Sequence, residues 1–147
     1  MLVLVDGSDT SMLAIRHAIL FAKNQNGRIK FVHVVAHMEA WAVEGHISLD
    51  KSFRENGAKL LEEAAALAKT GSIETEVALL ESNGKQPATV IVREAADWPA
   101  DILLMGSSGR GSVDRFIFGS VTEGVLRTAT VPVLLLPRDD SAMTISV

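Results

Sequence analysis

Short apolar segments alternate with longer amphipathic segments along the whole chain. The apolar segments have the length of buried strands, which we expect at Leu2–Val5, Arg28–Val35, Ile73–Leu80, Asp101–Met105 and Val131–Leu136. Between them, apolar residues recur at helical spacing, which predicts helices at Asp9–Asn26, Leu49–Thr70, Pro87–Asp97 and Ile117–Thr128. Strands and helices therefore alternate from one end of the chain to the other.

This alternation predicts an α/β fold with a doubly wound parallel sheet of five strands, because parallel strands need helical, right-handed crossovers. Hydrophobic residues make up 48% of the chain and aromatic residues only 5%, which suits an aliphatic sheet covered by Ala-rich helices. Ile73–Leu80 alternates apolar and polar residues and is expected at an edge. At 147 residues, the chain is expected to form one domain.

Several residues in the sequence indicate where the helices begin and end. Ser8 or Asp9 is expected to cap the first helix, and Pro87 suits the first turn of the third. Trp98-Pro99 is expected to end that third helix. Ala36–Ser48 has a mixed composition and is interpreted as a long loop or a lid.

Composition excludes several classes of function. The net charge of −4 argues against a nucleic-acid partner, since duplex binders usually carry a basic stripe. The absence of cysteine excludes disulfides, thiolate zinc sites and thiol nucleophiles. The apolar segments are too short to span a bilayer, and the first residues lack the pattern of a signal peptide. We therefore expect a soluble, cytoplasmic protein that is not embedded in a membrane.

A loop rich in Gly and Ser joins the fourth expected strand to a helix that begins at Gly119-Ser120. Glycines let a backbone approach a ligand closely, and a helix N-terminus favours an anion, so this layout is typical of a phosphate site. It is not a Walker A loop, because Ser112 stands where that motif has lysine, and the Rossmann glycine spacing also fails. The alternative is an ordinary connection, although Gly106 to Phe116 exceeds the usual length of about 4–6 residues.

Two motifs resemble those of the universal stress protein family, in its ATP-binding branch. One is Gly106-x2-Gly109-x9-Gly119-Ser120, and the other is Val5-Asp6-Gly7-Ser8 at the end of the first strand. The resemblance covers Leu2 to Pro137, and it implies one nucleotide-binding domain over residues 1–137 followed by a tail at 138–147. It implies a Rossmann-like fold of the adenine nucleotide alpha hydrolase-like type, and it supports the strand order 3-2-1-4-5. The ligand would then lie at the switch point between strands one and four.

The resemblance also implies the ligand, ATP, and a set of binding residues. Asp6 would bind the ribose hydroxyls; its alternative role is that of a turn or capping residue. The full set comprises Leu4, Val34 and Met105 near the adenine, Asp6 near the ribose, and Gly106, Gly109, Arg110, Gly119, Ser120 and Val121 near the phosphates. Leu4, Val34 and Met105 suit core packing equally well, and Arg110 either replaces the Walker lysine or is a solvated loop residue.

The sequence contains no recognisable catalytic or metal-binding motif. His33 and His37 have a spacing that suits ligands on a helix, yet they lie where a strand leads into a loop. Any Mg²⁺ is expected to arrive with the nucleotide. No serine has the surroundings of a nucleophile. We therefore expect a nucleotide-dependent regulator with little or no fast catalysis; the alternatives are a slow ATPase or phosphotransferase, and an ATP-sensing partner of another protein such as a membrane transporter.

The last expectation concerns assembly. Val131–Leu136 is apolar on both faces although it is expected at an edge, and an uncovered edge is a template for pairing with another chain. The resemblance implies antiparallel pairing of this strand about a two-fold axis. We expect a homodimer, or a larger closed assembly, with the tail Arg138–Val147 in an oligomer contact.

Overall fold

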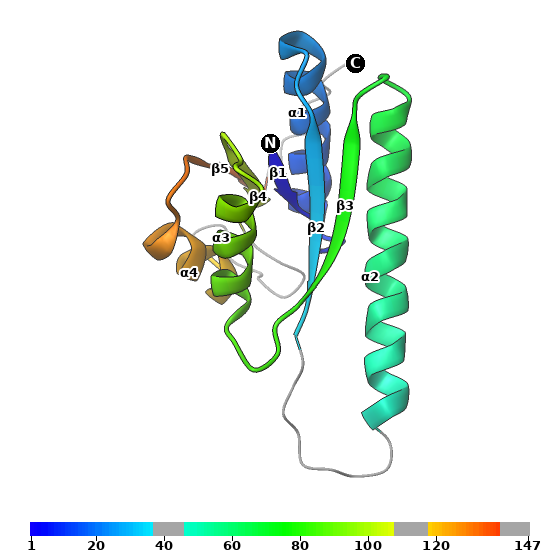
Figure 1. The fold of residues 1–147 in the computed structure, drawn as a ribbon, viewed down its shortest axis with the longest axis vertical. Helices are drawn as coiled ribbons and strands as arrows, with labels where there is room; N and C mark the ends of the chain where they lie inside the picture. Colours follow the sequence, from blue (N-terminus) through cyan, green and yellow to red (C-terminus); the bar gives the residue numbers. More distant parts are fainter. Residues whose placement is uncertain (37–45, 108–117, 139–147) are drawn as a thin grey trace.

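The computed structural model describes residues 1–36, 46–107 and 118–138, with side chains described from residue 51 onward in the second range. It contains one five-stranded sheet with the order β3-β2-β1-β4-β5, and every adjacent pair of strands is parallel (Figure 1). The strands are β1 (Leu2–Leu4), β2 (Ile29–Val35), β3 (Thr75–Glu81), β4 (Leu103–Gly106) and β5 (Val133–Leu136). The helices are α1 (Asp9–Gln25), α2 (His46–Lys69), α3 (Pro87–Asp97) and α4 (Ser120–Thr128). The predicted Rossmann-like fold and strand order are confirmed.

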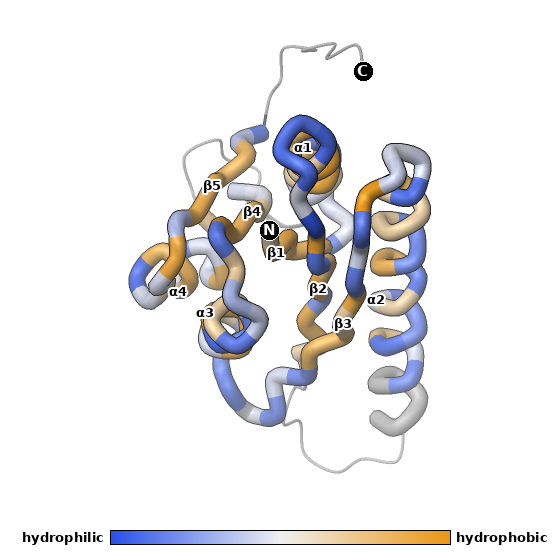
Figure 2. The backbone as a smooth tube through the Cα atoms, turned by 45° about the horizontal axis from the view of Figure 1, so that its top comes forward, coloured by the Kyte–Doolittle hydropathy of each residue, from blue (hydrophilic) through white to orange (hydrophobic). Residues whose placement is uncertain are grey.

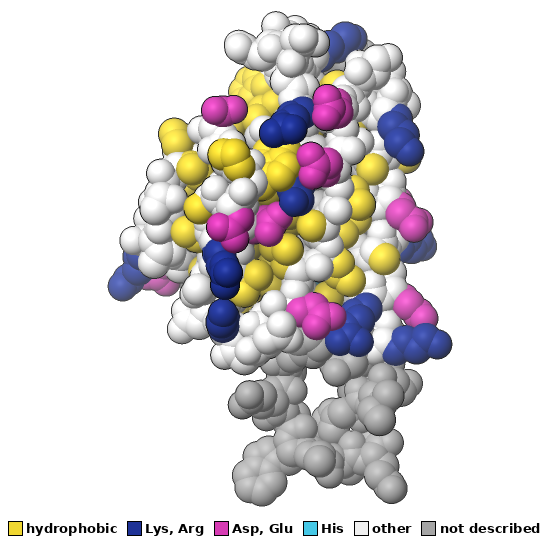
Figure 3. All heavy atoms as spheres, viewed as in Figure 1, with side chains coloured by type: hydrophobic (Ala, Val, Ile, Leu, Met, Phe, Trp, Pro, Cys, Tyr) yellow, Lys and Arg dark blue, Asp and Glu magenta, His cyan; other side chains and the backbone are white. Residues whose placement is uncertain are grey.

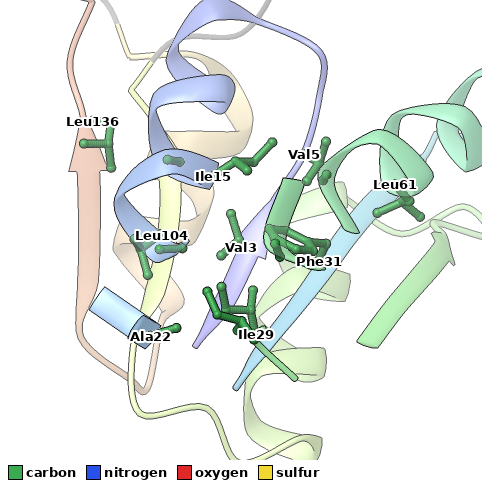
Figure 4. Packing of buried hydrophobic residues seen from close by; sticks show 14 residues of the cluster. Val3, Val5, Ile15, Ala22, Ile29, Phe31, Leu61, Leu104 and Leu136 are labelled. Atoms are coloured by element: carbon green, nitrogen blue, oxygen red, sulfur yellow. The ribbon is translucent and has the colours of Figure 1, made fainter. Parts of the chain in front are cut away.

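Helices cover both faces of the sheet. Because side chains alternate along a strand, Val3, Phe31 and Leu104 point into the layer formed with α1 and α2, where they meet Ile15 and Leu61 (Figure 4). The neighbouring strand residues form a second apolar cluster with α3 and α4 on the opposite face. Figure 2 shows the same arrangement, with apolar strands between helices whose polar residues face outward. The sheet is therefore buried between two helical layers at its centre.

Local signals explain where most elements begin and end. The Ser8 side chain caps α1 by accepting a hydrogen bond from Ser11 N, and Asn26 ends the helix in the left-handed conformation with a φ of 51°. Pro87 occupies the first turn of α3, as the sequence predicted. β3 and β5 are the two edge strands, as expected.

Two predicted boundaries need correction. Helix α2 begins at His46, so His46–Ser48 belongs to a helix and not to the expected loop of Ala36–Ser48, whose residues 37–45 lie outside the described part of the chain. Helix α4 begins at Ser120, the start that the Gly119-Ser120 pair predicted, and not at Ile117; Phe118 precedes the helix, and Gly119 is its extended N-cap. Ile117 itself lies outside the described residues, as does the tail from residue 139 onward.

The amino ends of β2 and β3 hold the carboxyl end of α3 through a cluster of charged and aromatic side chains. Lys30 Nζ lies 2.6 Å from Glu94 Oε1, and both side chains are largely shielded from solvent, with exposed fractions of 15% and 20%. Trp98 Nε1 donates to Glu76 Oε1 at 3.1 Å, and the Arg28 guanidinium lies 4.9 Å from the centre of the indole ring. Figure 3 shows acidic, basic and apolar side chains mixed on this face. This cluster fixes α3, whose opposite end reaches the site described below.

No helix in the part of the chain described here is long and apolar enough to cross a membrane.

Candidate functional site

A cavity of about 420 Å³ opens at the carboxyl ends of β1, β2 and β4. Its volume falls in the range of small-molecule pockets, roughly 300 to 1,000 Å³. The cavity lies where the strand order reverses between β1 and β4, and in open α/β sheets ligands bind at this position. The amino-terminal turns of α3 and α4 form its outer wall.

Every predicted site residue that the structure describes lines this cavity. These residues are Leu4, Asp6, Val34, Met105, Gly106, Gly119, Ser120 and Val121. The two other predicted residues, Gly109 and Arg110, lie outside the described part of the chain. Residues more than a hundred positions apart in sequence therefore meet at one place, because the carboxyl ends of parallel strands share one edge of the sheet.

The cavity also has lining residues that the sequence analysis did not assign to the nucleotide site. They are Val5, His33, Ala36, Pro87, Ile91 and Thr122. Val5, His33 and Thr122 are close neighbours of predicted residues, so their proximity in sequence was the available signal. Pro87 and Ile91 lie four positions apart on α3, so they share one helix face. The packing of α3 on the sheet turns this face towards the cavity. No local sequence pattern specifies that packing.

The turn after β1 holds the Asp6 carboxylate at the rim of the cavity. Asp6 Oδ1 accepts a hydrogen bond from Ser8 N at 2.8 Å, and Gly7 between them has a φ of 80°, which favours glycine. Oδ2 accepts no hydrogen bond from the described residues. Since Ser8 caps α1, Asp6 fixes the turn without capping the helix itself, and one of its oxygens stays available to a ligand.

Ser11 ties the same turn to helix α1 from the inside. Its hydroxyl accepts from Asp6 N at 3.1 Å and donates to the Leu4 carbonyl at 3.3 Å, and only 2% of the residue is exposed. A buried hydroxyl with both of its hydrogen-bonding roles satisfied is rigidly oriented. The backbone from Leu4 to Asp6 is therefore well ordered before any ligand arrives.

Gly106 ends β4 where α1 comes closest to the sheet. A Cβ atom at this position would lie 2.7 Å from Thr10 Cβ and 3.0 Å from Ser11 N. Thr122 Oγ1 donates to the Gly106 carbonyl at 3.3 Å and so links the end of β4 to α4. The glycine at 106 is therefore explained by the packing of α1 against β4, whether or not a phosphate approaches it.

Helix α4 presents its amino terminus to the cavity without a side-chain cap. Its N-cap, Gly119, has a φ of −62° and a ψ of 157°, and no described side chain bonds to the first turn. The first N–H groups of a helix have no partner within the helix, and the helix dipole favours negative charge there. Because Ser120, Val121 and Thr122 line the cavity, these N–H groups are available to an anion in it.

The walls of the cavity divide by chemistry. Leu4, Val34, Ile91 and Met105 supply apolar surface, whereas Asp6, Ser120 and Thr122 supply polar groups. Among the described lining residues, Asp6 carries the only formal charge when His33 is neutral. The arrangement suits a ligand with a flat apolar part, hydroxyl groups and an anionic part.

The described residues include His, Asp and Glu side chains, which are common metal ligands. They contain no group of three His, Asp or Glu residues that could hold a metal ion.

A second cavity of about 550 Å³ lies at the amino ends of the strands, beside Phe21, Arg28, Trp98 and Asp101. No predicted site residue lines it. It is larger than the first cavity but lies at the end of the sheet away from the switch point. Its position therefore provides a useful comparison for binding experiments.

The sheet order and the position of the first cavity define a doubly wound α/β protein with a ligand crevice at its switch point. The model of the universal stress protein family matches residues 1–137. The chain therefore belongs to the universal stress protein family, and the resemblance seen in its sequence motifs is confirmed.

Individual relatives agree with this assignment. A universal stress protein of Methanocaldococcus jannaschii is 31% identical over 136 residues, which cover 90% of this chain and 78% of the relative. A crystal structure of a family member from Burkholderia pseudomallei superposes with a TM-score of 0.75 at 29% identity, covering 93% of this chain and 94% of that one. The universal stress protein from Archaeoglobus fulgidus in complex with dAMP superposes with a TM-score of 0.66 at 25% identity, covering 93% and 95%.

Proposed function

We propose that this protein binds an adenine nucleotide, with ATP as the physiological ligand, in the cavity at the carboxyl ends of β1 and β4. The observation that carries the proposal is the convergence of three features in one cavity: an apolar wall, the Asp6 carboxylate and the uncapped amino terminus of α4. The complex of the Archaeoglobus fulgidus relative with dAMP supports an adenine nucleotide as the ligand class.

Each part of a nucleotide has a complementary part of the cavity. The base would pack between apolar side chains, among them Leu4, Val34 and Met105. The ribose hydroxyls would donate to the Asp6 oxygen that the turn leaves available. The phosphates would accept hydrogen bonds from the first N–H groups of α4, at Ser120 and Val121. Gly109 and Arg110 would add contacts from the glycine loop.

We further propose that the bound nucleotide acts as a regulatory ligand. Fast chemistry on a nucleotide needs a group that activates the attacking oxygen. Among the polar side chains that line the described cavity, Thr122 is bonded to the Gly106 carbonyl, and Asp6, with one oxygen bonded to Ser8 N, is assigned above to the ribose and not to the phosphates. We expect a turnover of ATP below about 1 s⁻¹, the low end of typical enzymes.

Calorimetry on nucleotide-stripped protein tests the proposal. ATP, ADP, AMP and inorganic phosphate would be titrated separately, and phosphate release from ATP would be followed in parallel. We expect one site per chain with an affinity for ATP in the micromolar range or better, and a clear preference over phosphate alone. Millimolar or weaker binding of all three nucleotides, with no preference over phosphate, would contradict the proposal. Rapid turnover would instead identify an enzyme.

We also propose a homodimer formed by the open edge of β5. The main-chain groups of Val133 and Leu135 point away from β4, because Leu103 N bonds to Pro132 O and Ser107 N bonds to Leu136 O, and residues alternate along a strand. The same strand of a second chain could pair with this edge about a two-fold axis. The tail from residue 138 onward would then extend the contact.

A further inference from the structure

The second cavity, of about 550 Å³ at the amino ends of the strands, combines apolar walls with charged groups. Phe21 and Ile102 supply apolar surface, and 37% of Phe21 is exposed. Arg28 and Asp101 line the same cavity and are exposed to solvent. Apolar walls with a few charged or polar groups are the usual form of a small-molecule site. The charged groups therefore indicate which kind of molecule would fit.

The Arg28 guanidinium is held over an aromatic ring and has no carboxylate partner in the described part of the chain. Its central carbon lies 4.9 Å from the centre of the Trp98 ring, and Trp98 Nε1 is itself bonded to Glu76. The neighbouring cation, Lys30, lies within 4.0 Å of two carboxylates, those of Glu76 and Glu94. No described carboxylate forms an ion pair with Arg28. A guanidinium carries five N–H donors in a planar fork that matches a carboxylate.

The two other charged groups of the cavity offset each other while the Met1 ammonium is protonated. This ammonium donates to the Arg28 carbonyl at 2.9 Å. Burial lowers its pKa, Asp101 raises it and Arg28 lowers it, so the three charges lie close together. Asp101 and the ammonium have opposite signs, which leaves the Arg28 charge in excess. One negative charge on a ligand is therefore favoured, whereas a second one would be opposed by Asp101.

We propose that the second cavity binds a small carboxylate with an apolar body about the size of an aromatic ring. The carboxylate pairs with the Arg28 guanidinium, and the body packs against Phe21 and Ile102. An exposed ion pair alone is weak, so binding requires the apolar body as well as the charge. This site lies at the opposite end of the sheet from the nucleotide cavity and does not depend on the proposed function.

The fluorescence of a Trp41→Phe variant tests the proposal, because Trp98 is then the only tryptophan in the chain. The probe is 3-phenylpropionate. Two controls divide its features: 3-phenylpropanamide keeps the ring without the charge, and propionate keeps the charge without the ring. We expect a saturable change in Trp98 emission with 3-phenylpropionate. The affinity for the amide should be about fivefold lower, which corresponds to one favourable exposed ion pair, and propionate should not saturate in the same range.

Variants of the cavity assign each contact. Arg28→Gln removes the charge and should lower the affinity for 3-phenylpropionate about fivefold, while the affinity for the amide stays the same. Phe21→Ala removes apolar surface that both probes use and should weaken both equally. Arg16→Gln, exposed on α1 and outside the cavity lining, makes the same change of charge and is the matched control. Urea denaturation of each variant verifies that it is folded.

The outcomes separate a built site from general attraction of anions. A preference for the acid over the amide that Arg28→Gln abolishes and Arg16→Gln retains supports the proposal. Equal binding of the acid and the amide to the parent protein would overturn the role of Arg28. A Trp98 signal that does not saturate with either ring compound would overturn the site itself. AMP should leave Trp98 emission unchanged, and displacement of 3-phenylpropionate by AMP would also contradict the proposal.

Discussion

Two roles are open to Asp6, one in the turn and one in the proposed ribose contact, and its place in the sequence does not separate them. One carboxylate oxygen fixes the turn through Ser8 N, and the other, at the rim of the cavity, accepts no hydrogen bond from the part of the chain that the structure describes. The two alternatives that the sequence left open, a turn residue and a ribose-binding residue, are compatible in this geometry. They make different demands on the side chain, because the turn needs only an acceptor, whereas the ribose gains from the charge.

Substitution of Asp6 by Asn and by Ala should separate the two roles. Asp6→Asn keeps an acceptor for Ser8 N but removes the charge, so stability should be nearly unchanged while affinity for adenosine falls about tenfold or more. Asp6→Ala should also lower the free energy of unfolding by about 1 kcal/mol. Calorimetry and urea denaturation measure the two effects. Unchanged adenosine affinity in Asp6→Asn would assign Asp6 to the turn alone.

At the scale of elements, the amino terminus of α4 is built differently from that of α1. Ser8 caps α1 with its hydroxyl, whereas Gly119 leaves the first turn of α4 uncapped. The extended backbone of Gly119 is accessible to any residue, so glycine is not required there for its conformational freedom. We interpret the uncapped end as the part of the helix that an anionic ligand completes.

Gly119→Ser should therefore stabilise the fold and weaken nucleotide binding. A serine hydroxyl at the N-cap can accept hydrogen bonds from the first turn of the helix, which should raise the free energy of unfolding by a few tenths of a kcal/mol, about the difference between Ser and Gly caps. The same bond occupies N–H groups that the phosphates need, so AMP affinity should fall by roughly tenfold. Adenosine, which has no phosphate, provides the control and should bind as before. Unchanged AMP affinity would remove α4 from the phosphate site.

Helices α3 and α4 form the outer wall together and touch through two small residues. A Cβ atom at Gly124 would lie 2.6 Å from Ala88 Cβ, so a larger residue at position 124 would collide with α3 at the present spacing. Pro87 and Ile91 on one helix and Ser120 and Val121 on the other line the cavity. The distance between these helices therefore sets the width of the cavity on this side.

Moving the methyl group from position 88 to position 124 tests this packing. Gly124→Ala should push the helices apart, lower the free energy of unfolding by about 1–3 kcal/mol and weaken nucleotide binding. The double variant Ala88→Gly/Gly124→Ala carries the same atoms in the opposite arrangement and should recover most of both losses. Urea denaturation of the two single variants and the double variant gives the coupling energy. Additive effects without recovery would show that the contact does not determine the spacing.

At the scale of the whole molecule, the open edge of β5 determines how chains can assemble. Leu135→Pro removes a main-chain donor that points away from β4, and proline is tolerated on edge strands. We expect this variant to sediment as a folded monomer while the wild-type protein sediments as a dimer at micromolar concentration. Leu135→Ala keeps the donor and is the matched control for the lost side chain. A wild-type monomer, with or without ATP, would contradict the proposed dimer.

The overall fold was predictable because its signals are local or follow general rules. The apolar runs, the Ser8 cap and Pro87 locate the elements, while crossover handedness and the family motifs together give the strand order. The pair Asp6 and Gly119 could be assigned to one site because both follow or precede an element at the carboxyl edge of the sheet. These inferences require no knowledge of side-chain packing.

The remaining features depend on contacts between distant segments. Gly57 is explained by the side chains of His33 and Leu79 on two strands, and Gly106 by Thr10 on α1. Nothing in the local sequence around either glycine indicates these contacts. Ile91 likewise reaches the cavity only through the way α3 packs on the sheet. Such residues are specified by tertiary structure, which periodicity and turn propensity do not encode.

The central claim is that an adenine nucleotide binds between the carboxyl ends of β1 and β4, and chemical-shift mapping tests it most directly. AMP and ATP would be titrated into labelled, nucleotide-stripped protein that contains both cavities in their native form. We predict saturable shifts at Asp6, Val34, Gly106 and Val121, with the Arg28 and Trp98 signals unmoved. Shifts confined to Arg28, Trp98 and their neighbours at the opposite end of the sheet, or no saturable shifts at all, would contradict the account.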